Sequence, residues 1–282
     1  MSDNLNSALQ RVIENTHSDA ADKLLAGLSS LKSAFSSQQF FYLFAICPRW
    51  FGKGTPEENT DLIPFDHYGV LHNWSNAQLA RLFVLSTLAQ TVDKQSYKKN
   101  INELFKTADL NEMVLLVHAL SFLPEPEAFV ERAREAARSN IESVFCALAH
   151  NSNYASKYFD LAGWNQLVLK AAFLAVPIWS MVGLRERNNT ELVTMLKNYA
   201  IERQAAARTV PWDLFCCPGW LASSEPELEF LVQQHARGTN KIKAAISMAL
   251  SENTHREAKK LAATLAPQQK ISWQDIATLE NE

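Results

Sequence analysis

Apolar residues recur along this chain at the spacing of three and four residues that places side chains on one face of a helix. The clearest stretch begins at Ser18, a residue type that caps helices, and its apolar positions are Leu24, Leu25, Leu28, Leu31 and Phe35. Strand-like alternation is hard to find, and the turn pairs Asn-Gly, Asp-Gly and Gly-Gly are absent. The pattern therefore predicts an all-α protein.

The same reading divides the chain into a succession of helices. The longer predicted ones run from about Ser75 to Gln90, Glu127 to Ala149 and Ala155 to Phe173, and Asp109 and Asn188 or Asn189 are expected to start others. The helix after Ser75 is expected to face inward through Leu79, Leu82, Phe83 and Ser86. Residues 52–73 hold two prolines and three glycines and predict a long irregular loop.

Short helices joined by brief turns near the C-terminal end indicate how the helices are arranged. Such pairs are typical of an α-solenoid built from HEAT-like antiparallel helix pairs. No exact period repeats in the sequence, so an irregular helical bundle is the alternative. We expect one all-helical domain over residues 1–282.

Composition and charge narrow the function classes. The 282 residues carry a net charge of −3, with a pI of about 6.2, and form no basic stripe, which argues against nucleic acid as a partner. The longest apolar run, Phe40 to Cys47, is far shorter than the roughly 20 residues of a membrane-spanning helix, so no membrane insertion is expected. Four cysteines without a CxxC spacing indicate reduced thiols, and we expect a cytoplasmic protein.

The sequence contains no motif that predicts a catalytic, metal or cofactor site. The stretch FGKGT resembles a phosphate loop, but it lacks the first glycine and the final Ser or Thr and follows no strand. Asp66, His67 and His72 are too few and too irregularly spaced to predict a zinc site. His118 is expected to make a hydrogen bond in the core. We therefore predict no catalytic residue, no metal and no cofactor.

Two segments carry polar side chains within otherwise apolar helices: WNQLVLKAAF, residues 164–173, and NYAIERQAAARTVPWDLF, residues 198–215. Gln166 and Lys170 lie four residues apart and share a helical face. In the second segment, alanines surround Glu202 and Arg203 and permit a close approach of another helix. Buried polar groups need partners, so we expect these two segments to pack together.

Two interpretations of this contact remain open. In the first, the polar side chains form a structural ladder, for example between Glu202 and Lys170. In the second, they line a cleft that binds a polar metabolite, with the candidate ligand-binding residues Trp164, Asn165, Lys170, Glu202, Arg203 and Arg208.

Three functions follow from these interpretations. The first is a non-catalytic adaptor or binding protein, acting through the polar cleft or through a face that docks partners. The second is an enzyme for a cyclitol-like or prenylated compound, with Glu202 and Lys170, or Glu202 and His150, as acid and base. The third is a purely structural scaffold that grips other proteins through its aromatic residues, namely Trp74, Trp179, Trp212, Trp220 and Trp273.

Longer motifs resemble a known family. The stretches WNQLVLKAAF, ERQAAAR, VPWDLF, TADLNEMVLLVHALSFLPEPEAF and PRWFGKG are similar to those of the EboA family, and the likeness extends from about Phe40 to Ala262. Ala207 stands where the family pattern has a glycine.

The resemblance implies a bacterial, cytoplasmic protein of secondary metabolism, encoded in a metabolite gene cluster. Its expected role is traffic or export of a small metabolite or its precursor. The expected partners are the other proteins of that cluster, including a membrane prenyltransferase, together with the small metabolite itself. The family brings no agreed catalytic residues.

Overall fold

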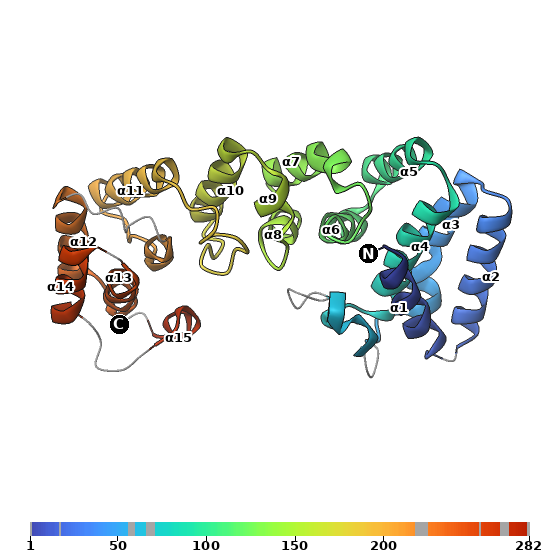
Figure 1. Cartoon of the computed structure of the whole chain (residues 1–282), viewed down its shortest axis with the longest axis horizontal. Coiled ribbons are helices and arrows are strands. Elements are labelled where there is room, and N and C mark those ends of the chain that lie inside the picture. The colour runs from blue at the N-terminus through green and yellow to red at the C-terminus, as the bar shows by residue number, and fades with distance from the viewer. Residues whose placement is uncertain are drawn as a thin grey trace. The chain divides into compact units, whose positions relative to one another are not determined.

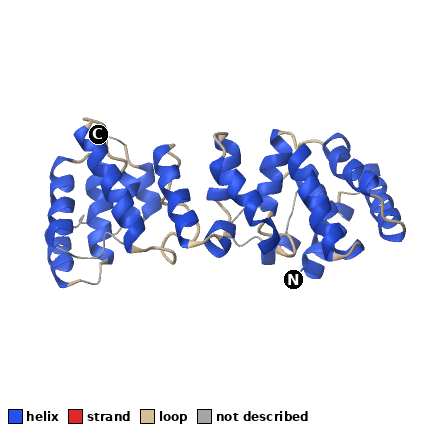
Figure 2. Ribbon diagram, turned by 90° about the horizontal axis from the view of Figure 1, so that it is seen from above, coloured by secondary structure: helices blue, strands red, loops and turns tan. Residues whose placement is uncertain are grey.

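The computed structural model describes residues 2–16, 18–55, 60–65, 71–217, 225–253, 255–265 and 271–280. Within these ranges the regular elements are helices and none is a strand, which confirms the predicted all-α class (Figure 2). The chain forms two compact units, Met1–Tyr154 and Ala155–Glu282, and each is described by itself. One domain over the whole chain, stacked as a solenoid, stays a prediction.

The first unit is built from helices joined by short connections (Figure 1). They are α1 (Ser2–Glu14), α2 (Asp19–Ser33), α3 (Ser37–Phe51), α4 (Asn76–Thr91), α5 (Lys94–Thr107), α6 (Leu110–Ala119), α7 (Val130–Arg138) and α8 (Glu142–Ala149), with short 3₁₀ helices η1 (Thr60–Phe65), η2 (Leu71–Asn73) and η3 (Pro126–Phe129). Helices α1, α2 and α3 pack on α4, and both α6 and α7 pack on α8.

Helix α4 is the centre of the first unit. Its residues from Leu79 to Leu88 are all buried, so it buries its whole circumference instead of the single stripe that the sequence predicted. One of the buried residues is Arg81, whose guanidinium Nη2 lies 2.7 Å from the Glu112 carboxylate of α6. Its Nε donates to the Phe44 carbonyl of α3 at 3.0 Å. A buried charge therefore ties three helices together.

The second unit contains η4 (Trp212–Cys216) and the helices α10 (Leu161–Phe173), α11 (Thr190–Ala205), α12 (Glu225–Arg237), α13 (Asn240–Glu252), α14 (Arg256–Leu265) and α15 (Trp273–Thr278). The short helix α9 (Tyr154–Tyr158) begins at the last residue of the first unit. Helix α13 is central here, because it packs against η4, α12, α14 and α15.

Polar caps fix where the helices begin. Ser18, Asp109 and Asn189 accept hydrogen bonds from the first turns of α2, α6 and α11, as the sequence predicted. Asp109 and Glu112 form a reciprocal capping box. These side chains satisfy donors that have no partner within the helix, and so they set the helix boundaries locally.

Two of the predicted long helices are interrupted. The expected helix from Glu127 to Ala149 is divided into η3, α7 and α8, and the Ser139 hydroxyl accepts from the Ile141 amide at 3.1 Å where α7 ends. The expected helix from Ala155 to Phe173 breaks at Asp160, which caps α10 by accepting from the Gly163 amide at 2.8 Å. Both breaks have one cause, since short polar side chains compete for backbone donors that a continuous helix would use.

Helix α5 was not predicted from the sequence, although the spacing of its apolar residues indicates a helix. Tyr97, Ile101, Leu104 and Phe105 are its buried apolar residues, and they recur at the spacing of a helical face. The predicted loop at residues 52–73 contains η1 and η2, and its residues 56–59 and 66–70 lie outside the described ranges.

Candidate functional site

Helices α10 and α11 are the two segments that the sequence singled out, and they pack against each other. The Tyr199 hydroxyl donates to the Ala172 carbonyl at 3.3 Å, and the rings of Phe173 and Tyr199 meet edge to face with centroids 4.6 Å apart. The contact is thus aromatic and apolar at the C-terminal end of α10.

The buried amide of α10 has a specific partner. Asn165 is 1% exposed and exchanges two hydrogen bonds with Asn189, at 3.2 and 2.8 Å. Asn189 also caps α11, because its Oδ1 accepts from the Leu192 amide at 2.9 Å. The amide in the apolar segment therefore locks the start of one helix to the middle of the other, which is a structural role.

Trp164 is also part of the packing. It is 1% exposed, and the Arg187 guanidinium lies over its ring at 5.7 Å from the centroid. The same guanidinium donates to the carbonyls of Ser156 and Phe159 at 2.8 and 3.0 Å. Trp164 is therefore held as a wall of the core and offers no open surface to a ligand.

The other predicted site residues are Lys170, Glu202, Arg203 and Arg208, and in the part of the chain that the structure describes no ion pair or hydrogen bond joins one of their side chains to another. Lys170 is half-buried, and partial desolvation lowers the pKa of its ammonium group. Glu202 and Arg208 are exposed, and among the described residues no ion pair joins Glu202 to Lys170. Arg203 donates to the Thr209 carbonyl at 2.6 Å and lies over the Tyr199 ring, so it holds the C-terminal end of α11.

Helix α11 ends in a backbone conformation that favours glycine. Ala207 has φ +54°, in the left-handed region, and the Arg208 amide returns to the Arg203 carbonyl at 2.8 Å, as in a Schellman cap. This gives a physical reason for a glycine at the position, as the resemblance implied, since an alanine there costs roughly 1–2 kcal/mol.

Replacing Ala207 with glycine is expected to raise the free energy of unfolding by about 0.5–1 kcal/mol, because the strain relieved exceeds the entropy that glycine adds to the unfolded chain. Denaturant unfolding measures the effect. The matched control is Ala205→Gly at the last residue of α11, where the backbone is helical, and this variant is expected to lose about 0.5–1 kcal/mol. Equal losses in both variants would contradict the prediction.

A pocket of about 220 Å³ lies elsewhere in the second unit, and we call it the tryptophan pocket. Its lining residues are Trp179, Met181, Gly183, Leu184, Arg185, Glu186, Cys216 and Trp273. The connection between α10 and α11, the element η4 and helix α15 supply them. The ring of Trp179 is 6.4 Å from that of Trp212. None of the six residues predicted as ligand-binding lines this pocket.

Charged groups surround the pocket. The Nη2 atom of Arg185 lies 2.7 and 2.9 Å from the two carboxylate oxygens of Glu252 on α13. The Asp213 carboxylate accepts from the Ile178 amide at 2.8 Å, and burial raises the pKa of this carboxyl group. Burial likewise raises the pKa of the Cys216 thiol well above its usual range, so this thiol stays protonated and is a poor nucleophile.

A second recess, of about 790 Å³, lies between α12 and α14. Its lining residues are Leu228, Glu229, Val232, His255, Glu257, Lys260, Leu261 and Thr264. The Lys260 ammonium is paired with the Glu257 carboxylate at 2.8 Å, so the positive charge of Lys260 at the edge of this recess is balanced. This recess also contains none of the predicted site residues.

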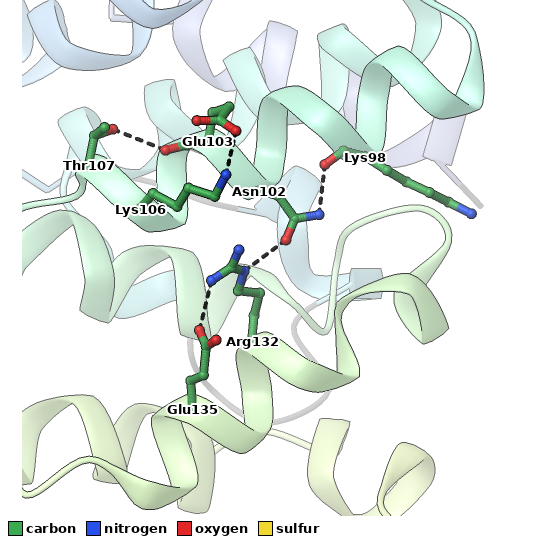
Figure 3. A network of polar contacts seen from close by, with 7 residues as sticks. All are labelled: Lys98, Asn102, Glu103, Lys106, Thr107, Arg132 and Glu135. Atoms are coloured by element: carbon green, nitrogen blue, oxygen red, sulfur yellow. Dashed lines mark hydrogen bonds and ion pairs between the residues drawn. The ribbon is translucent and has the colours of Figure 1, made fainter.

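The first unit has a polar network of its own between α5 and α7 (Figure 3). Arg132 donates from Nε to the Asn102 amide oxygen at 2.8 Å and from Nη1 to Glu135 at 2.8 Å. Its guanidinium also lies over the Phe105 ring at 5.9 Å from the centroid. The other pairs of this network are surface contacts within one helix, such as Lys106 with Glu103, so we interpret it as a clasp between two helices.

The described residues offer neither a metal site nor a membrane-spanning helix. Among residues with a described placement, no group of three or more His, Cys, Asp or Glu side chains is arranged to hold a metal ion. Asp66 and His67 lie outside the described ranges. No described helix combines the length and the apolar character needed to cross a bilayer.

Of the tryptophans named as possible anchors, Trp74 is buried, whereas Trp179, Trp212 and Trp273 are half-buried. Trp220 lies outside the described ranges. Trp179 and Trp273 line the pocket and are far apart in the sequence. Their residue type made them candidates, but the sequence did not predict that they meet.

The fold and the pocket define an all-helical protein with a small recess walled by aromatic and charged side chains. The chain belongs to the EboA family, whose description is metabolite traffic protein EboA, and the match covers residues 1–217. The predicted resemblance is thereby confirmed. Neither the curated proteins nor the solved structures give a match to this chain.

Proposed function

We propose that this protein is a non-catalytic binding protein of metabolite traffic, and that the tryptophan pocket holds its small-molecule cargo. The observation that carries the proposal is the pocket itself, an aromatic-walled recess of about 220 Å³ with charged groups at its edge. Small-molecule sites combine apolar walls with a few placed polar groups and usually measure about 300–1,000 Å³, so a pocket of this volume favours a small cargo. The family description, metabolite traffic, supports a cargo that is a metabolite.

The alternative of an acid–base enzyme has less support. Acid–base catalysis requires two groups within reach of one substrate, and Glu202 is exposed to solvent without a described ion pair to Lys170. At the tryptophan pocket, the protonated Cys216 thiol is not an activated nucleophile. Binding without chemistry is therefore the function that this geometry favours.

Partners and location extend the proposal. The four cysteines, all within the described ranges, form no disulfide, which supports a reducing compartment such as the bacterial cytoplasm. We propose that the protein exchanges its cargo there with other proteins of the same metabolite cluster, among them a membrane prenyltransferase. Capture of those proteins by the tagged full-length chain tests this part.

Retention of small molecules tests the binding function. The full-length chain is equilibrated with a small-molecule extract of its source cells and then analysed by native mass spectrometry. We expect the wild type to retain at least one compound that Trp179→Leu no longer retains, because the pocket loses an aromatic wall.

The matched control is Trp50→Leu, which removes a tryptophan of α3 that does not line the pocket. It is expected to retain the same compound as the wild type. Identical sets of retained compounds in all three proteins, or none in any of them, would refute the proposed binding site.

A further inference from the structure

The charge balance around the tryptophan pocket indicates which ligands it favours. Arg185 contributes one positive charge to the wall, and the Glu252 carboxylate faces it at 2.7 and 2.9 Å. A contact from one guanidinium nitrogen to both carboxylate oxygens is a charge-assisted pair in which the two charges offset each other. The pair therefore adds little net charge to the pocket.

Glu186 stands next in the wall and has no such partner. Its side chain is exposed, and no ion pair to it occurs within the described ranges of the chain. Glu186 and Glu252 are two carboxylates, and Arg185 is the one basic residue of the lining. The acidic groups thus outnumber the basic ones around the recess.

The aromatic walls act in the same direction. Trp179 and Trp273 line the recess. The face of an indole ring carries the negative part of the ring quadrupole and attracts a cation within roughly 6 Å of the ring centre. Tryptophan is the strongest of the aromatic side chains in this interaction. A ligand with a positive charge gains both from the ring faces and from the excess carboxylate. An anion is opposed by the excess carboxylate and can gain only from the Trp273 Nε1–H, which is buried without a hydrogen-bond partner among the described residues.

Size and wall chemistry limit the rest of the ligand. A dry cavity of about 150 Å³ accepts benzene, so a pocket of about 220 Å³ has room for a somewhat larger body. Met181, Leu184 and Cys216 give the wall an apolar part against which such a body can pack.

We propose that the tryptophan pocket binds a small organic cation, an ammonium group attached to a compact apolar body. The proposal rests on the proposed binding function and adds to it the charge class of the cargo. Glu186 and the two tryptophans are the groups that select for the positive charge, and the pairing of Arg185 with Glu252 keeps the competing guanidinium charge neutralised.

Glu252 and Trp273 belong to α13 and α15, and the family match ends at residue 217. Glu252 pairs with the lining residue Arg185, and the lining residues other than Trp273 lie within the matched part. The C-terminal helices therefore supply two of the groups that determine charge selectivity.

Three probes that share one ring system separate charge from shape. They are 2-naphthylmethylammonium, 2-naphthylmethanol and 2-naphthoate, each titrated into the full-length chain by calorimetry at neutral pH and low salt. We expect the cation to bind about tenfold more tightly than the alcohol, and the carboxylate to bind most weakly. The preference is expected to shrink as salt screens the charges.

Charge-changing variants move the probes in opposite directions. Glu186→Gln is expected to weaken the cation about threefold to tenfold and leave the alcohol nearly unchanged. Glu252→Gln exposes the Arg185 charge, so it is expected to weaken the cation and strengthen the carboxylate. Arg185→Gln is expected to strengthen the cation. A variant that merely damages the fold would weaken all three probes together, which distinguishes the two effects.

Glu191→Gln serves as the control, since it removes the same charge from an exposed position in the first turn of α11. It is expected to change no probe by more than about twofold, because Glu191 does not line the pocket and solvent screens an exposed charge. Tighter binding of the alcohol or the carboxylate than of the cation overturns the inference, while retention of compounds by the wild type still supports the pocket. Failure of every probe to bind also overturns it, and the retention experiment then decides the proposed function separately.

Discussion

Replacing Arg81 with alanine is expected to lower the free energy of unfolding by about 3–5 kcal/mol. The Arg81 side chain is only 8% exposed, and it bonds the Glu112 carboxylate at 2.7 Å and the Phe44 carbonyl at 3.0 Å. Its guanidinium also lies over the Phe44 ring, 4.8 Å from the centroid. The truncation leaves a largely buried carboxylate and a carbonyl without their partner and empties the space between three helices.

Urea unfolding followed by circular dichroism measures this loss. The control is Lys23→Ala, which breaks the exposed pair with Asp19 on α2 and is expected to cost less than about 0.5 kcal/mol. Glu112→Gln is expected to fall between the two, because glutamine still accepts from the Arg81 guanidinium. A loss below about 1 kcal/mol for Arg81→Ala would show that the buried pair does not hold the first unit together.

The stability of the protein is expected to fall by about 3 kcal/mol as the pH is lowered from 7 to 4, through His118 alone. Burial lowers the pKa of this imidazole from 6.5 to about 4. Its Nδ1 is buried without a hydrogen-bond partner, so the core hydrogen bond expected from the sequence is not made by this atom. The ring of Trp74 lies 6.1 Å away, and an aromatic neighbour does not replace the lost hydration.

The direction follows from which state takes up the proton first. Between pH 6.5 and about 4 the unfolded chain binds a proton at His118 while the folded chain does not. The stabilising contribution is therefore complete above pH 6.5, declines as the pH falls toward 4, and declines no further once both states are protonated.

Unfolding curves for the wild type and His118→Gln over this pH range test the assignment. Glutamine does not titrate, so the variant is expected to lose less stability than the wild type between pH 6.5 and 4. His255→Gln is the control, because His255 is exposed, and its profile is expected to follow that of the wild type. Parallel profiles for the wild type and His118→Gln would assign the pH dependence to other groups.

The fold class could be predicted because its signals are local. A helical face recurs within a few residues, and a cap such as Asp109 acts on an amide three positions away. Two helices were predicted too long because a polar side chain takes a backbone amide donor at each break. The Ser139 hydroxyl does so where α7 ends, and the Asp160 carboxylate does so where α10 starts. Helix α5 was not predicted, although its apolar residues recur in the sequence at the spacing of a helical face.

The candidate site depended on contacts that no local pattern encodes. Asn165 was singled out as a polar residue inside an apolar helix, and its partner is the side chain of the residue that caps α11. Arg185 and Glu252 lie 67 residues apart in the sequence and meet only because α13 packs beside the connection that follows α10. Trp273 reaches the pocket from the last helix in the same way.

The sequence by itself determined the all-helical class, the capped starts of several helices and the resemblance to the EboA family. Only the tertiary structure decided which polar side chains are consumed by packing and which surround a recess. The reason is physical: helix formation and capping depend on neighbours within one turn, whereas a pocket exists where side chains from distant helices fail to fill the space between them.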